Sequence, residues 1–236
     1  MGGNVIISGR GLCRYYQRGS ETVRALDGVD IDIRSGEAVC ILGPSGSGKT
    51  TLINLLSALD APTAGTLAID GRRVDGLPEH ELVTIRRGTL GYVFQEFHLI
   101  PTLTVAENVA LPLLFLGKKP AQESLARVLD SVGLADRSSH LPKELSGGQM
   151  QRVAIGRALI IRPRVLIADE PTGNLDRQTG DTIFDLFLKA VREEGVALVL
   201  TTHNLALAER CDRTVTLEDG KVTAETTVSE KAAQPR

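Results

Sequence analysis

Tryptophan is absent from the 236-residue sequence, and aromatic residues make up only 3% of it. Few rings are therefore available to stack on the bases of a nucleic acid. The formal net charge is −2, so no general positive field draws the chain to nucleic acid or to anionic lipid. These two shortages predict that nucleic acid is not among its partners.

Cysteine and long apolar runs are also scarce. Cys13, Cys40 and Cys211 are scattered, odd in number and without a C-x-x-C pair, which argues against a disulfide framework or a cysteine metal site and fits a reducing compartment. No run approaches the ~18 apolar residues of a membrane span. The N-terminus also lacks the basic and apolar regions of a signal peptide. We therefore expect a cytoplasmic protein that reaches a membrane only through a partner.

What the chain does contain is the pattern of one α/β domain with a full core. Strand patterns at 4–8, near 22–26 and at 29–33 follow one another without helices, which predicts an antiparallel β layer. Residues 104–162 carry three helical patterns and no clear strand, which predicts an inserted helical part. We expect a single domain over residues 1–236, made of an α/β core with the antiparallel layer (about 1–95 and 163–225), a helical subdomain (about 96–162) and a disordered tail (226–236).

A glycine-rich loop at residues 43–50 separates an apolar strand pattern (38–42) from a helical one. This is the context of a P-loop, in which glycines turn backbone N–H groups inward and the helix begins with the positive end of its dipole. Lys49 is expected to reach the β- and γ-phosphates of a nucleotide, and the Thr50 hydroxyl to bind Mg²⁺. The residues predicted to hold the phosphates are Gly43, Pro44, Ser45, Gly46, Ser47, Gly48, Lys49, Thr50 and Thr51.

Two further apolar runs, 165–168 and 196–201, end in polar residues. Parallel strands of an α/β sheet present such residues at the edge where a ligand binds. Asp169 is expected to fix the Mg²⁺ shell, and Glu170 to deprotonate an attacking water; the alternative is that the two carboxylates are a solvated strand end or a helix N-cap. His203 follows the second run and either hydrogen-bonds a γ-phosphate or is structural.

The segment Leu145-Ser146-Gly147-Gly148-Gln149 precedes a helical pattern and predicts a second anion-binding turn. One nucleotide does not need two such turns from one chain. Two copies facing each other head to tail would pair the P-loop of each with the Ser146-Gly147-Gly148 turn of the other.

Together these motifs resemble the ATPase subunit of ABC transporters, over about residues 4–225. Residues 43–50 look like the Walker A loop, 145–149 are identical with the signature motif, and 165–169 with Glu170 resemble Walker B. The resemblance implies a P-loop NTPase (RecA-like) core with an antiparallel β subdomain and an inserted α-helical subdomain. It also implies that two copies bind Mg·ATP between them and that the helical part contacts an integral membrane permease at the inner face of the cell membrane.

The same resemblance assigns roles that the residue pattern leaves open. Tyr15 and Tyr16 are expected in the loop after the first strand, where either could stack on a nucleobase or pack on its neighbours. The family pattern selects Tyr16 as the adenine-stacking residue. It implies that Gln95 contacts Mg²⁺ or the attacking water, that 174–176 form the D-loop, and that His203 is the switch histidine.

Stretches at 94–101, 107–114 and 170–176 resemble the lipoprotein-release and macrolide-exporter branch, whose ATPase drives a permease with few spans. One alternative is a regulatory ABC module that signals through a membrane partner to cell-wall enzymes without transport. Another is a soluble ABC ATPase that acts on DNA or ribosomes, although the chain lacks the long coiled-coil insertions or second cassette usual there. Within the helical part, Val109 to Leu116 is expected either to pack in the core or to line a groove for a partner's helix.

Overall fold

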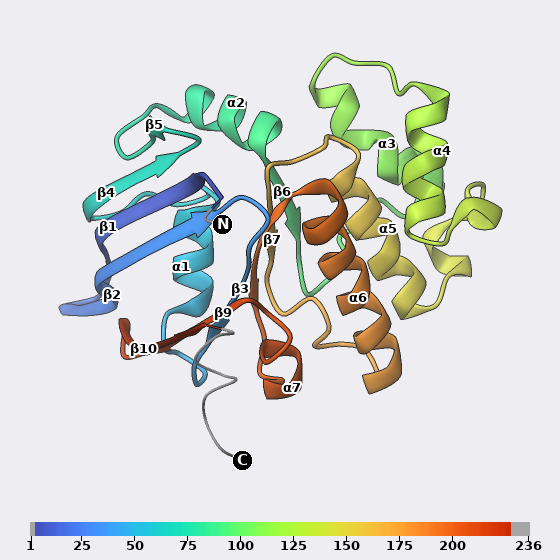
Figure 1. Ribbon diagram of the computed structural model, residues 1–236. Coiled ribbons are helices and arrows are strands. Elements are labelled where there is room, and N and C mark those ends of the chain that lie inside the picture. Colours follow the sequence, from blue (N-terminus) through green and yellow to red (C-terminus); the bar gives the residue numbers. More distant parts are fainter. Residues whose placement is uncertain (1–2, 228–236) are drawn as a thin grey trace.

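The computed structural model describes residues 3–227 (Figure 1). Its strands are β1 (Val5–Arg18), β2 (Glu21–Arg34), β3 (Ala38–Leu42), β4 (Ala64–Ile69), β5 (Arg72–Arg73), β6 (Leu90–Val93), β7 (Val165–Ala168), β8 (Ala197–Thr201), β9 (Arg213–Glu218) and β10 (Lys221–Thr227). Its helices are α1 (Lys49–Leu56), α2 (Glu79–Thr89), α3 (Val105–Phe115), α4 (Gln122–Ser131), α5 (Gly147–Leu159), α6 (Arg177–Glu194) and α7 (Leu205–Ala208). The predicted P-loop NTPase fold is confirmed, because the strands form one antiparallel sheet and one largely parallel sheet.

The antiparallel sheet has the order β2-β1-β4-β5. β1 pairs with β2 along almost its whole length, and the last pair joins Arg18 to Glu21. The expectation that Tyr15 and Tyr16 lie in a loop is therefore wrong, because both belong to β1. Register shifts between residues 9 and 15 break the alternation of apolar residues, so the strand pattern fades from the sequence while the pairing continues.

The second sheet has the order β10-β9-β3-β8-β7-β6. β3 pairs in parallel with β8 and β9, and β7 pairs in parallel with β8 and β6. All four residues of β7 and all five of β8 are buried, as expected for parallel strands covered on both faces. The prediction that residues 165–168 and 196–201 form neighbouring parallel strands is confirmed.

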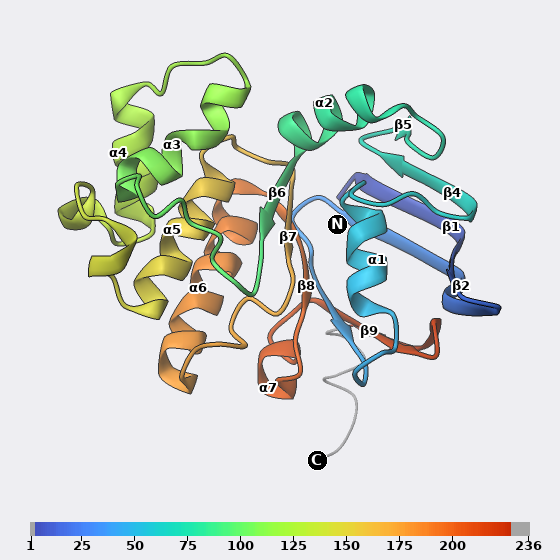
Figure 2. The same cartoon turned by 180° about the vertical axis from the view of Figure 1, so that it is seen from behind.

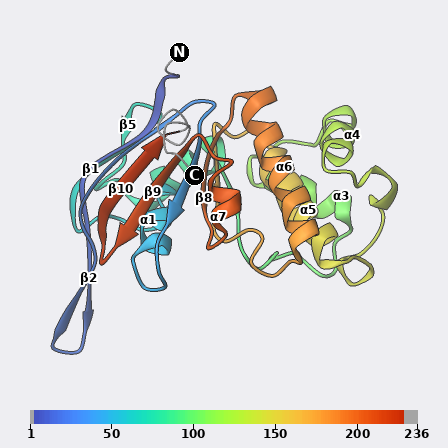
Figure 3. The same cartoon turned by 60° about the horizontal axis from the view of Figure 1, so that its bottom comes forward.

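Two hydrophobic cores lie on the two faces of this parallel sheet. One core packs α1 between the antiparallel sheet and the parallel strands, as Figure 2 shows from behind. The other packs α6 and α5 against the opposite face, and Figure 3 shows these two helices lying side by side there. Helices α3 and α4 lie beyond α5, and residues 96–162 contribute no strand to either sheet.

Gly156 lies where the family usually has alanine, and the sequence predicts that it weakens α5 slightly. A Cβ at this position would lie 3.2 Å from Cγ2 of Val109 on α3. The glycine thus allows α3 to pack closely against α5.

At the C-terminal end, β10 continues to Thr227, so Thr226 and Thr227 belong to a strand rather than to the predicted tail. The rest of that predicted tail, residues 228–236, lies outside the described residues. Between residues 3 and 227, none of the helices combines the length and apolar character needed to cross a membrane.

Candidate nucleotide site

The predicted P-loop connects β3 to the N-terminus of α1. Gly46 and Gly48 have φ values of 82° and 103°, in the left-handed region that favours glycine. A Cβ on Gly48 would lie 2.3 Å from the carbonyl oxygen of Ala25, because the loop passes directly against β2. The hydroxyl oxygen of Ser47 is buried in the loop without a hydrogen-bond partner in the described part of the chain. Such a loop, with an unsatisfied hydroxyl and the start of a helix, fits a bound phosphate chain.

Lys49 is the first residue of α1 and is only 7% exposed. Its Nζ donates hydrogen bonds to the carbonyl oxygens of Gly43 at 2.8 Å and Pro44 at 2.9 Å. No carboxylate forms an ion pair with it within residues 3–227. A buried ammonium without a counter-charge favours an anion as its next neighbour.

Polar side chains follow β7 and β8 at the carboxyl edge of the sheet. Oγ1 of Thr201 donates to Oδ1 of Asp169 at 2.7 Å and accepts the backbone N–H of Glu170 at 2.9 Å. Nε2 of His203 lies 2.5 Å from Oε1 of Glu170. The backbone of Glu170 has a φ of 44°, a conformation that a non-glycine residue keeps only where its surroundings fix it.

A cavity of about 380 Å³ brings these two regions together. Lys49 and Thr50 line it from the P-loop, and Glu170 and His203 line it from the ends of β7 and β8. Its other lining residues are Val23, Arg24, Ala25, Ser45, Gly46, Gly48, Thr51, Asp219 and Gly220. The cavity therefore joins the predicted phosphate-binding loop to the predicted base, Glu170.

Several of the predicted site residues lie outside that lining. Tyr16 pairs across the strands with Val23, which does line the cavity, but its hydroxyl donates to Asp60 at 2.9 Å. Nε2 of Gln95 donates to Oδ1 of Asn174 at 3.3 Å, which links the predicted Q-loop and D-loop.

The signature segment forms the start of α5, and none of residues 146–149 lines the cavity. Ser146 caps the helix: its Oγ accepts the N–H of Gln149, and the Gln149 side chain accepts the N–H of Ser146. A Cβ on Gly148 would lie 2.4 Å from Cγ2 of Thr179 on α6, so this turn needs a glycine for close packing.

Sequence reasoning missed Thr201 and Gln151. Thr201 is fully buried at the end of β8, and its position opposite Asp169 depends on the pairing of β7 with β8. Gln151 is fully buried on α5 and donates to the carbonyl oxygen of Pro171. For both residues, the only sign in the sequence is a polar residue within or at the end of an apolar pattern, which does not identify its partner.

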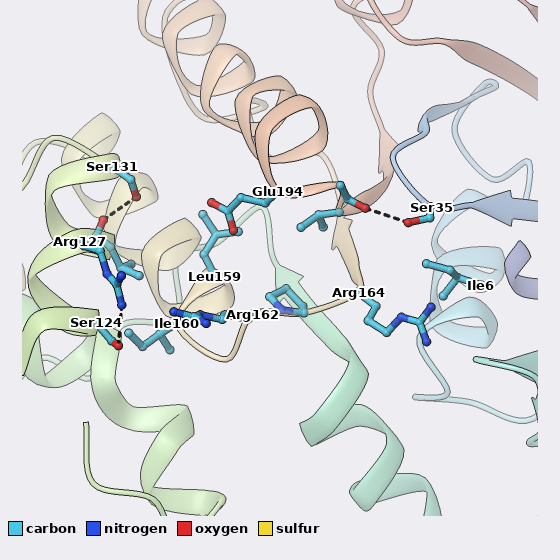
Figure 4. A pocket seen from close by; sticks show the side chains of 14 residues that line it. Ile6, Ser35, Ser124, Arg127, Ser131, Leu159, Ile160, Arg162, Arg164 and Glu194 are labelled. Carbon is cyan, nitrogen blue, oxygen red and sulfur yellow. Dashed lines mark hydrogen bonds between the residues drawn. The ribbon is translucent and has the colours of Figure 1, made fainter. Parts of the chain in front are cut away.

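A larger cavity of about 660 Å³ lies at the opposite edge, where β7 and β8 begin. Figure 4 shows the arginines at 127, 162 and 164 around it, together with Glu194. It contains none of the predicted site residues, and Arg162 and Arg164 are exposed to solvent. Of the two cavities, only the smaller one is lined by predicted site residues.

Comparisons with known proteins agree with one another on the family that this chain resembles. A model of the family described as ABC transporter matches residues 26–173. The lipoprotein-releasing system ATP-binding protein LolD of Gluconobacter oxydans is 47% identical over 90% of this chain and 93% of its own length. The macrolide export ATP-binding/permease protein MacB of Brucella melitensis is 43% identical over 96% of this chain, which spans 35% of that protein. A solved dimeric structure of the ATP-binding cassette MJ0796, in a post-hydrolysis state bound to ADP and Pi, shares 40% identity with a TM-score of 0.87, covering 94% of this chain and 99% of its own.

Proposed function

The chain belongs to the ABC transporter family, and from that premise we propose that it binds and hydrolyses ATP to drive a membrane permease. The observation that carries this proposal is the cavity that Lys49, Glu170 and His203 line together. A cation that holds phosphate and a carboxylate that accepts a proton are the two groups that hydrolysis of a phosphoanhydride requires.

Each group in the cavity has a chemical task. The Lys49 ammonium exchanges its loop carbonyl partners for oxygens of the β- and γ-phosphates, where it offsets negative charge. Glu170 accepts the proton of the attacking water, and His203 orients the Glu170 carboxylate from 2.5 Å away. Thr201 fixes the Glu170 backbone from β8.

The donor set suits Mg²⁺, which prefers oxygen ligands and is often held by a few side chains together with phosphates. The Thr50 hydroxyl, the Asp169 carboxylate and the Gln95 amide oxygen are the residues that would hold it. Phosphate oxygens of the nucleotide and water would supply the remaining ligands. The ion would neutralise charge on the transferred phosphoryl group. Tyr16 would stack on the adenine through the ring face opposite the Arg14 guanidinium, which lies 4.6 Å from the ring centroid.

A second copy of the chain completes the site. The Ser146-Gly147-Gly148 turn is capped and shaped but lies outside its own chain's cavity. In a head-to-tail pair this turn meets the γ-phosphate held by the partner's P-loop. The related cassette MJ0796 has been solved as a dimer, which supports this arrangement.

A cavity of about 340 Å³ between α2, β6, α3 and α5 is our candidate for docking a helix of the permease. Apolar side chains and three arginines, Arg86, Arg87 and Arg157, line it. Phe115, which lines it, and the neighbouring Leu114 are 59% and 60% exposed, whereas Val109 and Ala110 on the same helix are buried. Under this proposal, the buried part of the stretch from 109 to 116 packs in the core and its exposed part lines the groove for the permease helix. Docking there would keep the chain peripheral on the cytoplasmic face of the membrane.

The relatives named for lipoprotein release and macrolide export support a permease of that type. They do not favour the regulatory alternative without transport. The test is the hydrolysis rate of Glu170→Gln, which should fall by about a thousandfold, as expected for loss of a general base within a coupled site. Lys49→Ala should abolish tight ATP binding. Hydrolysis by Glu170→Gln near the wild-type rate would refute the assignment of the base.

A further inference from the structure

A glutamine on the signature helix reaches the two segments that carry Glu170 and Gln95. Gln151 lies in the second turn of α5 and is fully buried. Its Nε2 donates to the carbonyl oxygen of Pro171 at 2.7 Å and to that of Phe94 at 3.4 Å. Pro171 directly follows Glu170, and Phe94 directly precedes Gln95. One side-chain amide therefore holds both segments.

The other end of this amide has no partner. Oε1 of Gln151 is buried and accepts no hydrogen bond from the described residues. A buried oxygen in that state lowers stability, and a methionine of similar volume would fill the space without this cost. Packing alone therefore does not explain a glutamine here. What the amide supplies, and methionine lacks, is a donor for the two carbonyl oxygens.

The segment that Gln151 holds needs support from both sides. Glu170 has a left-handed backbone, and its N–H is fixed on one side by Thr201 of β8. The carbonyl of the next residue, Pro171, is fixed on the other side by Gln151. Removal of either contact frees the candidate base to move relative to the phosphate site.

We propose that Gln151 is a positioning residue that fixes the positions of Glu170 and Gln95 relative to the nucleotide bound by the same chain. The proposal rests on the ATPase function proposed above. Gln151 and Ser146 belong to one helix end, five residues apart. When the nucleotide held by the partner binds Ser146, α5 and Gln151 connect that contact to Glu170, the base that acts on the nucleotide of this chain.

The test compares Gln151→Met with Gln122→Met, the same exchange at an exposed position of α4. In the full chain, Gln151→Met should lower kcat for ATP by about tenfold or more, since misplaced catalytic groups lose rate steeply. KM should stay within about twofold. Methionine relieves the unpartnered Oε1 but leaves the Pro171 carbonyl without its donor, so these two effects on stability oppose each other and the Tm should stay within about 5 °C of the wild type. Gln122→Met should match the wild type in all three. A folded Gln151→Met variant with wild-type kcat would overturn the proposal; if methionine prevents folding, Gln151→Leu is measured in the same way.

A second measurement separates positioning from general damage. In a Glu170→Gln background, Gln151→Met should leave ATP-driven pairing of two chains intact and reduce residual hydrolysis much less than in the wild type. An equal reduction in both backgrounds, or loss of pairing, would contradict a role that runs through Glu170. If Glu170→Gln alone hydrolyses ATP normally, the proposed function fails instead, so the two failures are distinguishable.

Discussion

Replacement of Thr201 by valine tests how the ends of β7 and β8 hold the candidate base. The exchange preserves volume in a fully buried position and removes only the hydroxyl. It leaves the Glu170 N–H without its acceptor and removes the donor to Asp169. The first loss costs about 1–3 kcal/mol and the second about 1.5–3 kcal/mol, so the free energy of unfolding should fall by about 2.5–6 kcal/mol.

In a chain of this length that loss corresponds to a fall in Tm of about 5–24 °C, which calorimetry measures directly. Because Glu170 also loses its backbone support, kcat for ATP should drop by about ten- to a hundredfold. Thr201→Ser keeps the hydroxyl and should retain most of both properties. Thr202→Val removes only a turn contact to Asn204 and serves as the matched control. Wild-type Tm and kcat in Thr201→Val would refute the reasoning.

Three further outcomes follow from other parts of the molecule. Hydrogen bonds, above all from Arg73, hold the pKa of Asp75 below its usual range; its stabilisation is therefore complete above pH ~3.9 and is lost as pH falls through the lowered value. Asp75→Asn should thus cost about 0.5–1.5 kcal/mol at pH 7, and denaturant titrations should show the difference shrinking towards pH 2. Gly48→Ala should abolish ATP binding in a filter assay, because its Cβ would meet the backbone of β2. Phe115→Asp should prevent copurification with the permease while the chain alone hydrolyses ATP normally.

Local patterns were enough to predict most of the fold. Glycine spacing located the loop at 43–50, and apolar periodicity located helices α3 to α5 and strands β7 and β8. These features depend on residues close together in the sequence. The region around Tyr15 was misread because register shifts interrupt the alternation that marks a strand.

The candidate site was predictable only where one segment carries its own chemistry. The P-loop and the Asp169-Glu170 pair are of this kind. Thr201 and Gln151 act through contacts between residues 20 to 57 positions apart, such as Gln151 with Phe94 and Pro171, or Thr201 with the pair after β7. Their roles follow from tertiary packing, which a single sequence does not state.

The account depends on two chains closing over ATP, each completing the other's site. The most direct test is the mass of the Glu170→Gln variant in solution, measured by light scattering with saturating ATP and Mg²⁺. The account predicts twice the 25.3 kDa of one chain and a return to a single chain when nucleotide is removed. A mass of 25.3 kDa under saturating nucleotide, even with the permease supplied, would contradict it.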